Sequence, residues 1–408
     1  MSATDTTYDI AIVGAGPIGL TLAYGFGQAG LRVALLDRIP REVMLKPGHD
    51  GRTTALSYSS RQLLGGLGLW AALAGDAQPI LDIKVCEARV PVLLDFPSSL
   101  LGTEPMGHIV DNRQFRESIA LMIDSLPKGR VDWREATVET LKATSAFAEL
   151  HLASGEILNA RLLIAADGKF SPLRTQLGID TRTLKYGQTA IVTMIKHAKP
   201  HNGVALERFY PAGPFAVLPM TEDRSSIVWT EPEAAARYYV ASDERTFHAA
   251  LAERIGGYLG EFEVIGGRWS YPLMLQQASA YTAPRTALAG DTAHAIHPIA
   301  GQGVNLGMRD VALLLELVVD AARNGQDIGS ETVLETYGRR RFIDAHAMMA
   351  STDLLNRLFS NNSKTLKAVR NVGLAIFEKV TPLKRGAMRY AMGIAGENAP
   401  RLLKGGKL

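Results

Sequence analysis

The chain has 408 residues, of which 47% are hydrophobic and 21% charged, a formal net charge of +3 and a single cysteine, Cys86. This balance is that of a folded globular protein, the length predicts two interleaved lobes, and one cysteine excludes both an intramolecular disulfide framework and a cysteine-rich metal site. No stretch has the roughly 18 to 20 uncharged apolar residues of a spanning helix, because Glu316 and Asp320 interrupt the best candidate.

A βαβ unit is predicted near the start of the chain. Residues 8–13 and 31–36 are short, mostly apolar runs, and residues 19–29 have the pattern of a helix. The turn before this helix matches G-x-G-x-x-G. In this setting the turn is tight, the backbone can approach a pyrophosphate, and the partial positive charge of the helix N-terminus faces it. The predicted pyrophosphate contacts are therefore Gly14, Ala15, Gly16, Pro17, Ile18 and Gly19.

Asp37 ends the second apolar run, 23 residues after Gly14. An acid at this place accepts hydrogen bonds from an adenosine ribose, which completes the pattern of a dinucleotide site. FAD and NAD both fit this pattern. A glycine turn that serves only the packing of a helix on a strand is the alternative interpretation.

The middle of the chain predicts strands. From Val131 short alternating runs follow, at residues 138–141, 146–152 and 158–165, and predict a β-meander that returns to the first sheet. A second, largely antiparallel sheet is predicted from strand-like patterns at residues 189–229 and 262–275, with turns at 211–214 and 222–223. After Asp310 the periodicity is helical to the end of the chain, with a break around residues 381–382.

Two later segments bear on the choice between FAD and NAD. Residues 166–174 read Ala-Asp-Gly-Lys-Phe-Ser-Pro-Leu-Arg, and residues 288–294 lead into a glycine-rich stretch at 298–307. Together with the first glycine turn, they resemble the three fingerprints of the flavoprotein aromatic hydroxylases, the group A monooxygenases with the para-hydroxybenzoate hydroxylase fold. Residues 297–310 and 352–359 are similar to signatures of the UbiH-like ubiquinone-biosynthesis hydroxylases, as are residues 50–57, 111–113 and 186–190.

This resemblance runs from about residue 8 to about residue 396 and implies an α/β fold. A Rossmann-like FAD-binding domain is expected to be interleaved with a substrate domain built on a mostly antiparallel sheet, followed by a helical C-terminal region. The FAD-binding domain then comprises residues 1–80, 105–180 and 280–325, the substrate domain residues 81–104 and 181–279, and the C-terminal region residues 326–408.

The residues themselves support a flavin at the far end of the dinucleotide. Asp291, at a strand end beside a turn, can bond the hydroxyls of a ribityl chain, although a helix N-cap explains the same aspartate. Gly301, Gly303 and Gly307 leave the backbone free to pass close to a flat ring. A helix that starts near Gly303 would stabilise negative charge at N1 and the C2 carbonyl of the reduced flavin.

The resemblance implies further contacts with FAD and with the substrate, but it does not indicate a catalytic residue. Asp167 belongs to a segment credited with FAD and nicotinamide contacts, but a plain turn with Arg174 as a solvated helix residue is the alternative. Surface ion pairs are the alternative for the arginines. No cluster of carboxylates or cysteines accompanies His294 and His297, so no metal is predicted. A packed, hydrogen-bonded role is favoured for His297 over a substrate contact. The implied additional FAD contacts are Arg38, Arg52, Arg113, Val138, Asp167, Pro298, Gln302, Val304 and Asn305, and the implied substrate contacts are Phe215, Leu218 and His297.

The implied activity is hydroxylation of the aromatic ring of a polyprenylated phenol in ubiquinone biosynthesis, with FAD, O₂ and NAD(P)H, by way of a C4a-hydroperoxyflavin. Since the chain has one G-x-G-x-x-G, NAD(P)H must visit as a transient electron donor. The alternatives are a flavoprotein hydroxylase of another aromatic compound and a flavin-binding scaffold of a biosynthetic complex. Other ubiquinone-pathway proteins are expected partners; nucleic acid is not.

The charge of the C-terminal end bears on location. The first nine residues lack the Lys or Arg of a signal peptide, which predicts a cytoplasmic protein. The last 48 residues contain ten Lys or Arg against Glu378 and Glu397. Apolar residues between 366 and 380 share this basic segment, which fits an amphipathic helix on the inner face of an anionic membrane. A core-packing helix with a solvated basic face is the alternative.

Overall fold

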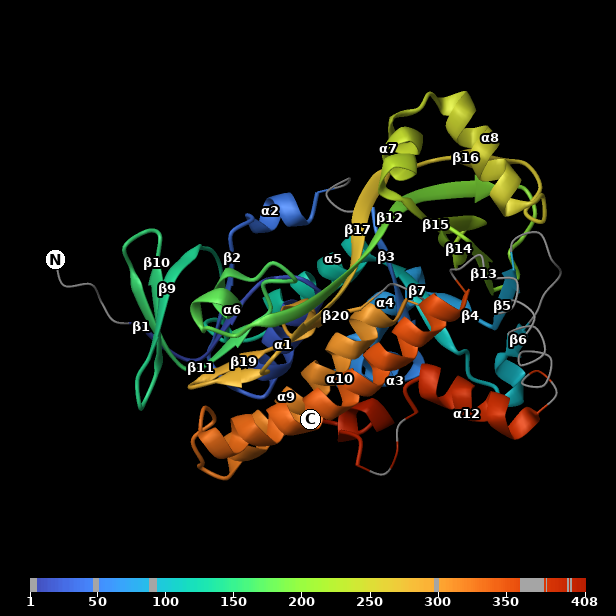
Figure 1. The fold of residues 1–408 in the computed structure, drawn as a ribbon. Coiled ribbons are helices and arrows are strands. Elements are labelled where there is room, and N and C mark those ends of the chain that lie inside the picture. Colours follow the sequence, from blue (N-terminus) through green and yellow to red (C-terminus); the bar gives the residue numbers. More distant parts are fainter. Residues whose placement is uncertain are drawn as a thin grey trace.

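The computed structural model describes residues 6–46, 51–87, 94–296, 301–359, 378, 380–394, 396 and 398–408. Its two large sheets lie toward opposite sides of the molecule, and the long strands β12 and β17 run from one toward the other (Figure 1). The helices α9 and α10 lie side by side along the first sheet (Figure 1).

The first sheet contains the predicted βαβ unit. Its strand order is β18-β19-β11-β1-β2-β8, and the pairs that β1 makes with β2 and with β11 are parallel. Val33 to Leu36 are fully buried, as expected for a parallel strand covered on both faces. The predicted meander is confirmed, because β9, β10 and β11 pair antiparallel. The strands are β1 (Thr6–Val13), β2 (Val33–Asp37), β8 (Val131–Glu135), β9 (Val138–Ala143), β10 (Ala148–Leu152), β11 (Ile157–Ala165), β18 (Thr282–Ala283) and β19 (Thr286–Leu288).

The second sheet has the order β20-β17-β12-β15-β14-β13-β5-β6, with β16 also paired to β12. All its pairs are antiparallel except β5 with β13, so the prediction of a second, largely antiparallel sheet is confirmed. β12 begins eight residues before the predicted start at 189. The strands are β5 (Asp82–Glu87), β6 (Leu94–Pro97), β12 (Thr181–His197), β13 (Val204–Tyr210), β14 (Gly213–Met220), β15 (Arg224–Pro232), β16 (Phe262–Val264), β17 (Trp269–Ala278) and β20 (His294–Ala295).

A third, small sheet was not predicted. It pairs β3 (Thr53–Ser57) with β7 (Gly107–Asp111), and β7 with β4 (Gln78–Ile80). The short helices in this part of the chain are α2 (Arg41–Met44), α3 (Tyr58–Gly66), α4 (Trp70–Leu73), η1 (Ala74–Asp76) and η2 (Ser98–Leu100).

The main helices cover the sheets. The helix α1 packs against α5 and α9, and α10 packs on α9, while Phe247 and Leu251 of α8 close the core of the second sheet. Among the described residues after α12, only the short η5 is helical, so the predicted helical pattern does not continue to the end of the chain. The helix α12 itself begins at Thr381 with a proline in its first turn. The helices are α1 (Pro17–Gln28), α5 (Asn112–Asp124), α6 (Pro172–Gln176), α7 (Glu233–Ala241), α8 (Glu244–Ile255), η3 (Gly290–Thr292), α9 (Gln302–Arg323), α10 (Glu331–Phe359), α12 (Thr381–Ala391) and η5 (Arg401–Lys404).

His108 in β7 makes the stability of the fold depend on pH. Its ring lies edge-on to Trp70, with centroids 4.7 Å apart. Burial, and to a smaller extent the charge of Arg61, lowers the pKa of His108 from 6.5 to about 4. Below pH 6.5 His108 is therefore protonated in the unfolded chain, whereas in the folded chain it stays neutral down to about pH 4. The free energy of unfolding consequently falls as the pH drops from 6.5 to 4.

We expect the free energy of unfolding to fall by about 1 to 2 kcal/mol between pH 7.5 and pH 5 from this group, once solvent screening is allowed for. Urea unfolding at the two pH values measures it. The variant His108→Gln cannot titrate and should show the smaller difference. Equal pH dependence in the two proteins would show that His108 is not the source.

Candidate functional site

A cavity of about 650 Å³ opens where the parallel strands of the first sheet end. The residues that follow β1, β2, β11 and β19 all line it, as expected for ligand sites at the carboxyl ends of parallel strands. Twelve of the predicted contact residues meet there, although they come from distant parts of the chain: Gly14, Gly16, Pro17, Ile18, Asp37, Arg38, Arg52, Val138, Asp167, Asp291, Gly303 and Val304.

The three glycines of the first turn serve different purposes. Gly14 has a φ of 110°, and a Cβ there would lie 2.2 Å from the carbonyl oxygen of Ala166. A Cβ on Gly19 would lie 1.8 Å from the carbonyl oxygen of Gly14. A Cβ on Gly16 would have no atom within 4 Å, and Gly16 lines the cavity. Gly14 and Gly19 are thus required for packing, and Gly16 leaves the space that a pyrophosphate would need.

Asp37 holds the same turn. Its Oδ2 accepts the backbone N–H of Ala15 at 2.7 Å, and its Oδ1 accepts that of Ile39 at 2.9 Å. Each carboxylate oxygen has two lone pairs, so both can still accept a ribose hydroxyl. Ala15 and Gly19 do not line the cavity themselves; they shape it.

Asp291 faces the cavity from the other side. It follows Gly290, whose φ of 61° is in the left-handed region, and no side-chain cap bond is made in η3. The side chain is surrounded by protein yet open to the cavity. Burial raises the pKa of Asp291, against the lowering effect of His294, Arg52 and Lys169. An aspartate that lines the cavity and does not cap a helix is suited to bind hydroxyl groups.

The loop after β11 is braced against η3. The Oγ1 of Thr292 donates to Asp167 Oδ1 at 3.1 Å, and burial raises the pKa of Asp167. Arg174 is buried, and it donates to the carbonyl oxygens of Thr292 and Lys169, each at 2.8 Å. The interpretation of Arg174 as a solvated helix residue is therefore wrong. Arg174 instead joins two loops that line the cavity.

The helix α9 starts at the cavity as predicted. Gly301 precedes it with a φ of 62°, and Gly303 and Val304 in its first turn line the cavity. A Cβ on Gly303 would meet nothing within 4 Å, which leaves the backbone accessible. Gly307 differs from the expectation, since a Cβ there would lie 2.7 Å from Ile18 and 3.3 Å from the Cα of Gly290. Gly307 allows α9 to pack on α1 and η3.

The side-chain amide of Asn305 is hydrogen-bonded to other residues of the protein. Its Oδ1 accepts from the backbone N–H of Ser57 and from Ser60 Oγ, both at 2.8 Å. Its Nδ2 donates to the carbonyl oxygens of Ala55 at 2.8 Å and of Gly301 at 3.1 Å. Gln302 Nε2 donates to the carbonyl oxygen of Ala391 at 3.4 Å. These contacts fasten the start of α9 to β3, α3 and α12.

The other predicted residues lie elsewhere. Arg113 does not line the cavity; its Nη1 donates to Glu117 at 3.0 Å in α5, as the ion-pair alternative has it. Phe215 is buried in the core of the second sheet, edge-on to Trp229 at 6.4 Å. Leu218 packs in the cluster around Met220. Thus, of the substrate contacts that fall within the described residues, neither reaches this cavity, and His297 and Pro298 lie outside the described residues.

Several lining residues were missed from the sequence. Tyr271 of β17 lies under the Arg52 guanidinium, which is 4.9 Å from the centroid of its ring, a cation–π contact. Phe170 is 69% exposed at the cavity wall. Position next to a recognised motif could have indicated Asn112, Arg116, Lys169 and Phe170, whereas no sequence signal indicates Tyr271.

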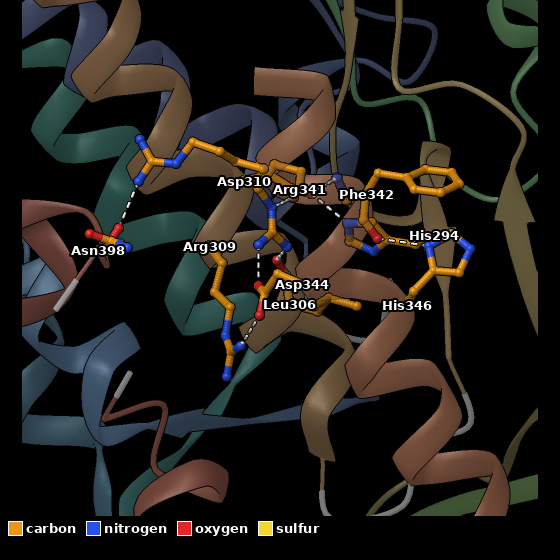
Figure 2. A network of polar contacts seen from close by, with 11 residues as sticks. His294, Leu306, Arg309, Asp310, Arg341, Phe342, Asp344, His346 and Asn398 are labelled. Atoms are coloured by element: carbon orange, nitrogen blue, oxygen red, sulfur yellow. Dashed lines mark hydrogen bonds and ion pairs between the residues drawn. The ribbon is translucent and has the colours of Figure 1, made fainter. Parts of the chain in front are cut away.

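The described residues offer neither a metal site nor a membrane-spanning helix. No group of three or more His, Cys, Asp or Glu among them is arranged to hold a metal ion. Within the same residues, no helix is long and apolar enough to cross a membrane. His294 is buried and bonded to Asp310, a carboxylate that lies 16 residues away in the chain (Figure 2).

Known proteins resemble this chain along nearly its whole length. The family described as FAD binding domain matches residues 7–352. Ubiquinone hydroxylase UbiL of Rhodospirillum rubrum is 41% identical, over 98% of this chain and 94% of that protein. The 3-demethoxyubiquinol 3-hydroxylase of Escherichia coli is 32% identical, over 96% of this chain and 100% of that protein. Among solved structures, p-nitrophenol 4-monooxygenase PnpA from Pseudomonas putida has the same fold, with a TM-score of 0.81 over 97% of this chain and 100% of that one, at 20% identity.

Proposed function

The chain belongs to the FAD-binding family of the ubiquinone hydroxylases, and from this premise we propose that it hydroxylates the aromatic ring of a polyprenylated phenol in ubiquinone biosynthesis. It is an FAD-dependent monooxygenase with an α/β fold, and NAD(P)H is its electron donor. The observation that carries the proposal is the cavity that joins the glycine turn to Asp291 and the first turn of α9. One extended dinucleotide would contact all three.

The residues present fit FAD. The open space at Gly16 and the start of α1 would receive the pyrophosphate, and Asp37 and Val138 would contact the adenosine half. Asp291 would bind the ribityl hydroxyls, and the start of α9 at Gly303 would face the ring. Arg38, Arg52 and Asp167 complete this set. Arg113 is left out of it because its guanidinium is paired with Glu117.

The protein contributes to the reaction by holding FAD and the aromatic ring in place and by keeping water out of the site. When bound, FAD supplies the acceptance of electrons from NAD(P)H and the activation of O₂. The positive end of the α9 dipole at Gly303 would stabilise negative charge on the reduced ring. The Arg52 guanidinium and Lys169 add positive charge at the same end of the cavity. Orientation of the aromatic ring and exclusion of water complete the protein's contribution.

The domain boundaries follow from this assignment. We propose that residues 1–80, 105–180 and 280–325 form the FAD-binding domain, residues 81–104 and 181–279 the substrate domain, and residues 326–408 the C-terminal region. The sheets support this division, because β5 and β6 pair with the second sheet although they precede most of the first.

Turnover of a prenylated phenol tests the function. Purified protein with bound FAD, given NAD(P)H, O₂ and a short-chain prenylated phenol, is expected to form one hydroxylated product for each NAD(P)H consumed. The same phenol without its prenyl chain is the control and should react poorly. Bound FAD without product would favour a scaffold, and equal reaction with the bare phenol would favour a hydroxylase of soluble aromatics. The intermediates that accumulate in a deletion strain, identified by mass spectrometry, would give the ring carbon.

Because the proposed substrate carries a lipid chain, we propose that α12 contacts the membrane. Leu383 and Tyr390 are 55% and 42% exposed on this helix, beside the exposed Arg385 and Arg389. Exposed apolar and aromatic side chains next to basic ones suit the surface of an anionic bilayer. The apolar residues of the tail between 366 and 377 lie outside the described residues.

Vesicle flotation tests this contact. The full-length protein is expected to float with anionic vesicles and to lose most of that binding in Leu383→Asp. The matched control is Leu121→Asp on α5, where a leucine is 69% exposed without such a setting. If both variants float like the unmodified protein, α12 does not bind the membrane.

A further inference from the structure

A buried carboxylate in α9 holds the turn that carries Asp291. Asp310 is fully buried, and its Oδ2 accepts the backbone N–H of Gly290 at 2.7 Å and Nε2 of His294 at 2.8 Å. Its Oδ1 accepts Nε of Arg341 at 2.5 Å. Figure 2 shows these side chains, from three separate parts of the chain, converging on one carboxylate.

Arg341, Asp344 and Arg309 continue the network from Asp310. Arg341 in α10 donates from Nη2 to the carbonyl oxygen of Leu306 at 3.1 Å and is also paired with Asp344. Asp344 accepts from Arg309 at 2.8 Å (Figure 2). Asp344 is 34% exposed, whereas the side chains of Asp310 and His294 are at most 1% exposed. The two carboxylates share Arg341, but of the two only Asp310 is hydrogen-bonded to the turn within the described part of the chain.

The charge state of Asp310 suits this role. Burial alone would raise its pKa, but the charges of His294 and Arg341 and the hydrogen bonds from them hold the pKa below the ordinary value. Asp310 is therefore an acceptor at both oxygens, and the Gly290 N–H has a charged partner.

The turn is held by α9 at two points one helical turn apart. Gly290 has a left-handed backbone, and the Gly307 backbone lies against its Cα. Asp310 then bonds the N–H of Gly290, the first residue of η3, and the ring of His294, which lies two residues after η3 ends. Because the backbone of Gly290 sets where the next Cα–Cβ bond points, this contact sets the direction of Asp291.

We propose that Asp310 is a positioning residue, which aims the Asp291 carboxylate into the cavity and so strengthens FAD binding without touching the cofactor. Asp310 does not line the cavity. The inference rests on the proposed function, because it takes Asp291 to be a ligand of FAD.

A double-mutant cycle on FAD binding tests the inference. The dissociation constant of FAD is measured for apoprotein of the unmodified chain, Asp310→Asn, Asp291→Asn and the double variant. Asp310→Asn should weaken FAD about tenfold, the size expected for a partner that orients a ligand-binding group. In the Asp291→Asn background the same change should have little further effect, because the two residues act as one unit. General loosening of the fold would weaken FAD equally in both backgrounds.

Asp344→Asn is the matched control. It removes a carboxylate from the same arginine but leaves the contacts to Gly290 and His294 in place. Its FAD dissociation constant should stay within about twofold of the unmodified value. Urea unfolding of each apoprotein records the loss of stability separately. If Asp310→Asn does not fold, the cycle is made with His294→Gln, which disturbs the other contact to the same oxygen and should show the same dependence on Asp291.

The outcomes separate the two proposals. If Asp291→Asn itself binds FAD as tightly as the unmodified protein, the assignment of Asp291 in the proposed function fails. If Asp291→Asn weakens FAD but the changes at Asp310 or His294 do not, or do so equally in both backgrounds, the positioning role is overturned.

Discussion

Replacement of Arg341 by methionine is expected to lower the free energy of unfolding by about 3 to 5 kcal/mol, the cost of leaving one member of a buried ion pair alone. Arg341 is the guanidinium that neutralises Asp310, and the two side chains are 4% and 0% exposed. In the variant, Asp310 would keep only His294 and the Gly290 N–H. Urea unfolding of the apoprotein at pH 7.5 measures the loss.

The control is Arg309→Met. Arg309 pairs with Asp344, which is 34% exposed and can be solvated when its partner is removed, so the expected loss is about 1 kcal/mol or less. Equal losses in the two variants would show that burial of Asp310 is not what makes Arg341 important.

The pH dependence follows from the same pair. In the unmodified protein the pKa of Asp310 is below its ordinary value of 3.8, so its stabilising effect is complete above that pH and is lost as the pH falls through the lower, folded-state pKa. Without Arg341 the pKa of Asp310 should rise, and the deficit of Arg341→Met should shrink in acid.

Replacement of Gly19 by alanine is expected to yield protein with little bound FAD and lowered stability. The added Cβ would lie 1.8 Å from the Gly14 carbonyl oxygen, which is backbone and cannot move without shifting the turn after β1. The loss of even two hydrogen bonds to a charged phosphate corresponds to about a tenfold or greater loss of affinity. Flavin released from the purified protein, measured by absorbance, gives the FAD content.

Two other glycines serve as controls for this variant. Gly16→Ala adds a methyl group in open space, so the apoprotein should be as stable as the unmodified one while FAD binds less well, because the methyl group faces the cavity. Gly65→Ala lies in α3 with no atom within 4 Å of its Cβ and should leave FAD content unchanged, with stability raised by roughly 0.5 to 1 kcal/mol. A Gly19→Ala protein with full FAD content would contradict the packing argument.

Two site residues, Asp37 and Asp291, were found because each lies at the end of a strand or just after it, and such positions meet at one edge of a parallel sheet. Phe215 lies in the core of the second sheet, and an aromatic residue on a strand has the same sequence pattern whether it faces a core or a ligand. Tyr271 was missed for the same reason. Its strand pattern does not reveal that Arg52, over 200 residues earlier, stacks on its ring.

The βαβ unit, the glycine turn, both classes of sheet and the acids at the strand ends could be predicted from the sequence, because each depends on periodicity or turn chemistry within a few residues. Only the tertiary structure decided which glycine faces the cavity, that Arg174 is buried, and that His294 and Arg341 meet at Asp310. These depend on contacts between segments that the chain brings together only on folding. No local pattern records such contacts, and the site's charges are balanced by them.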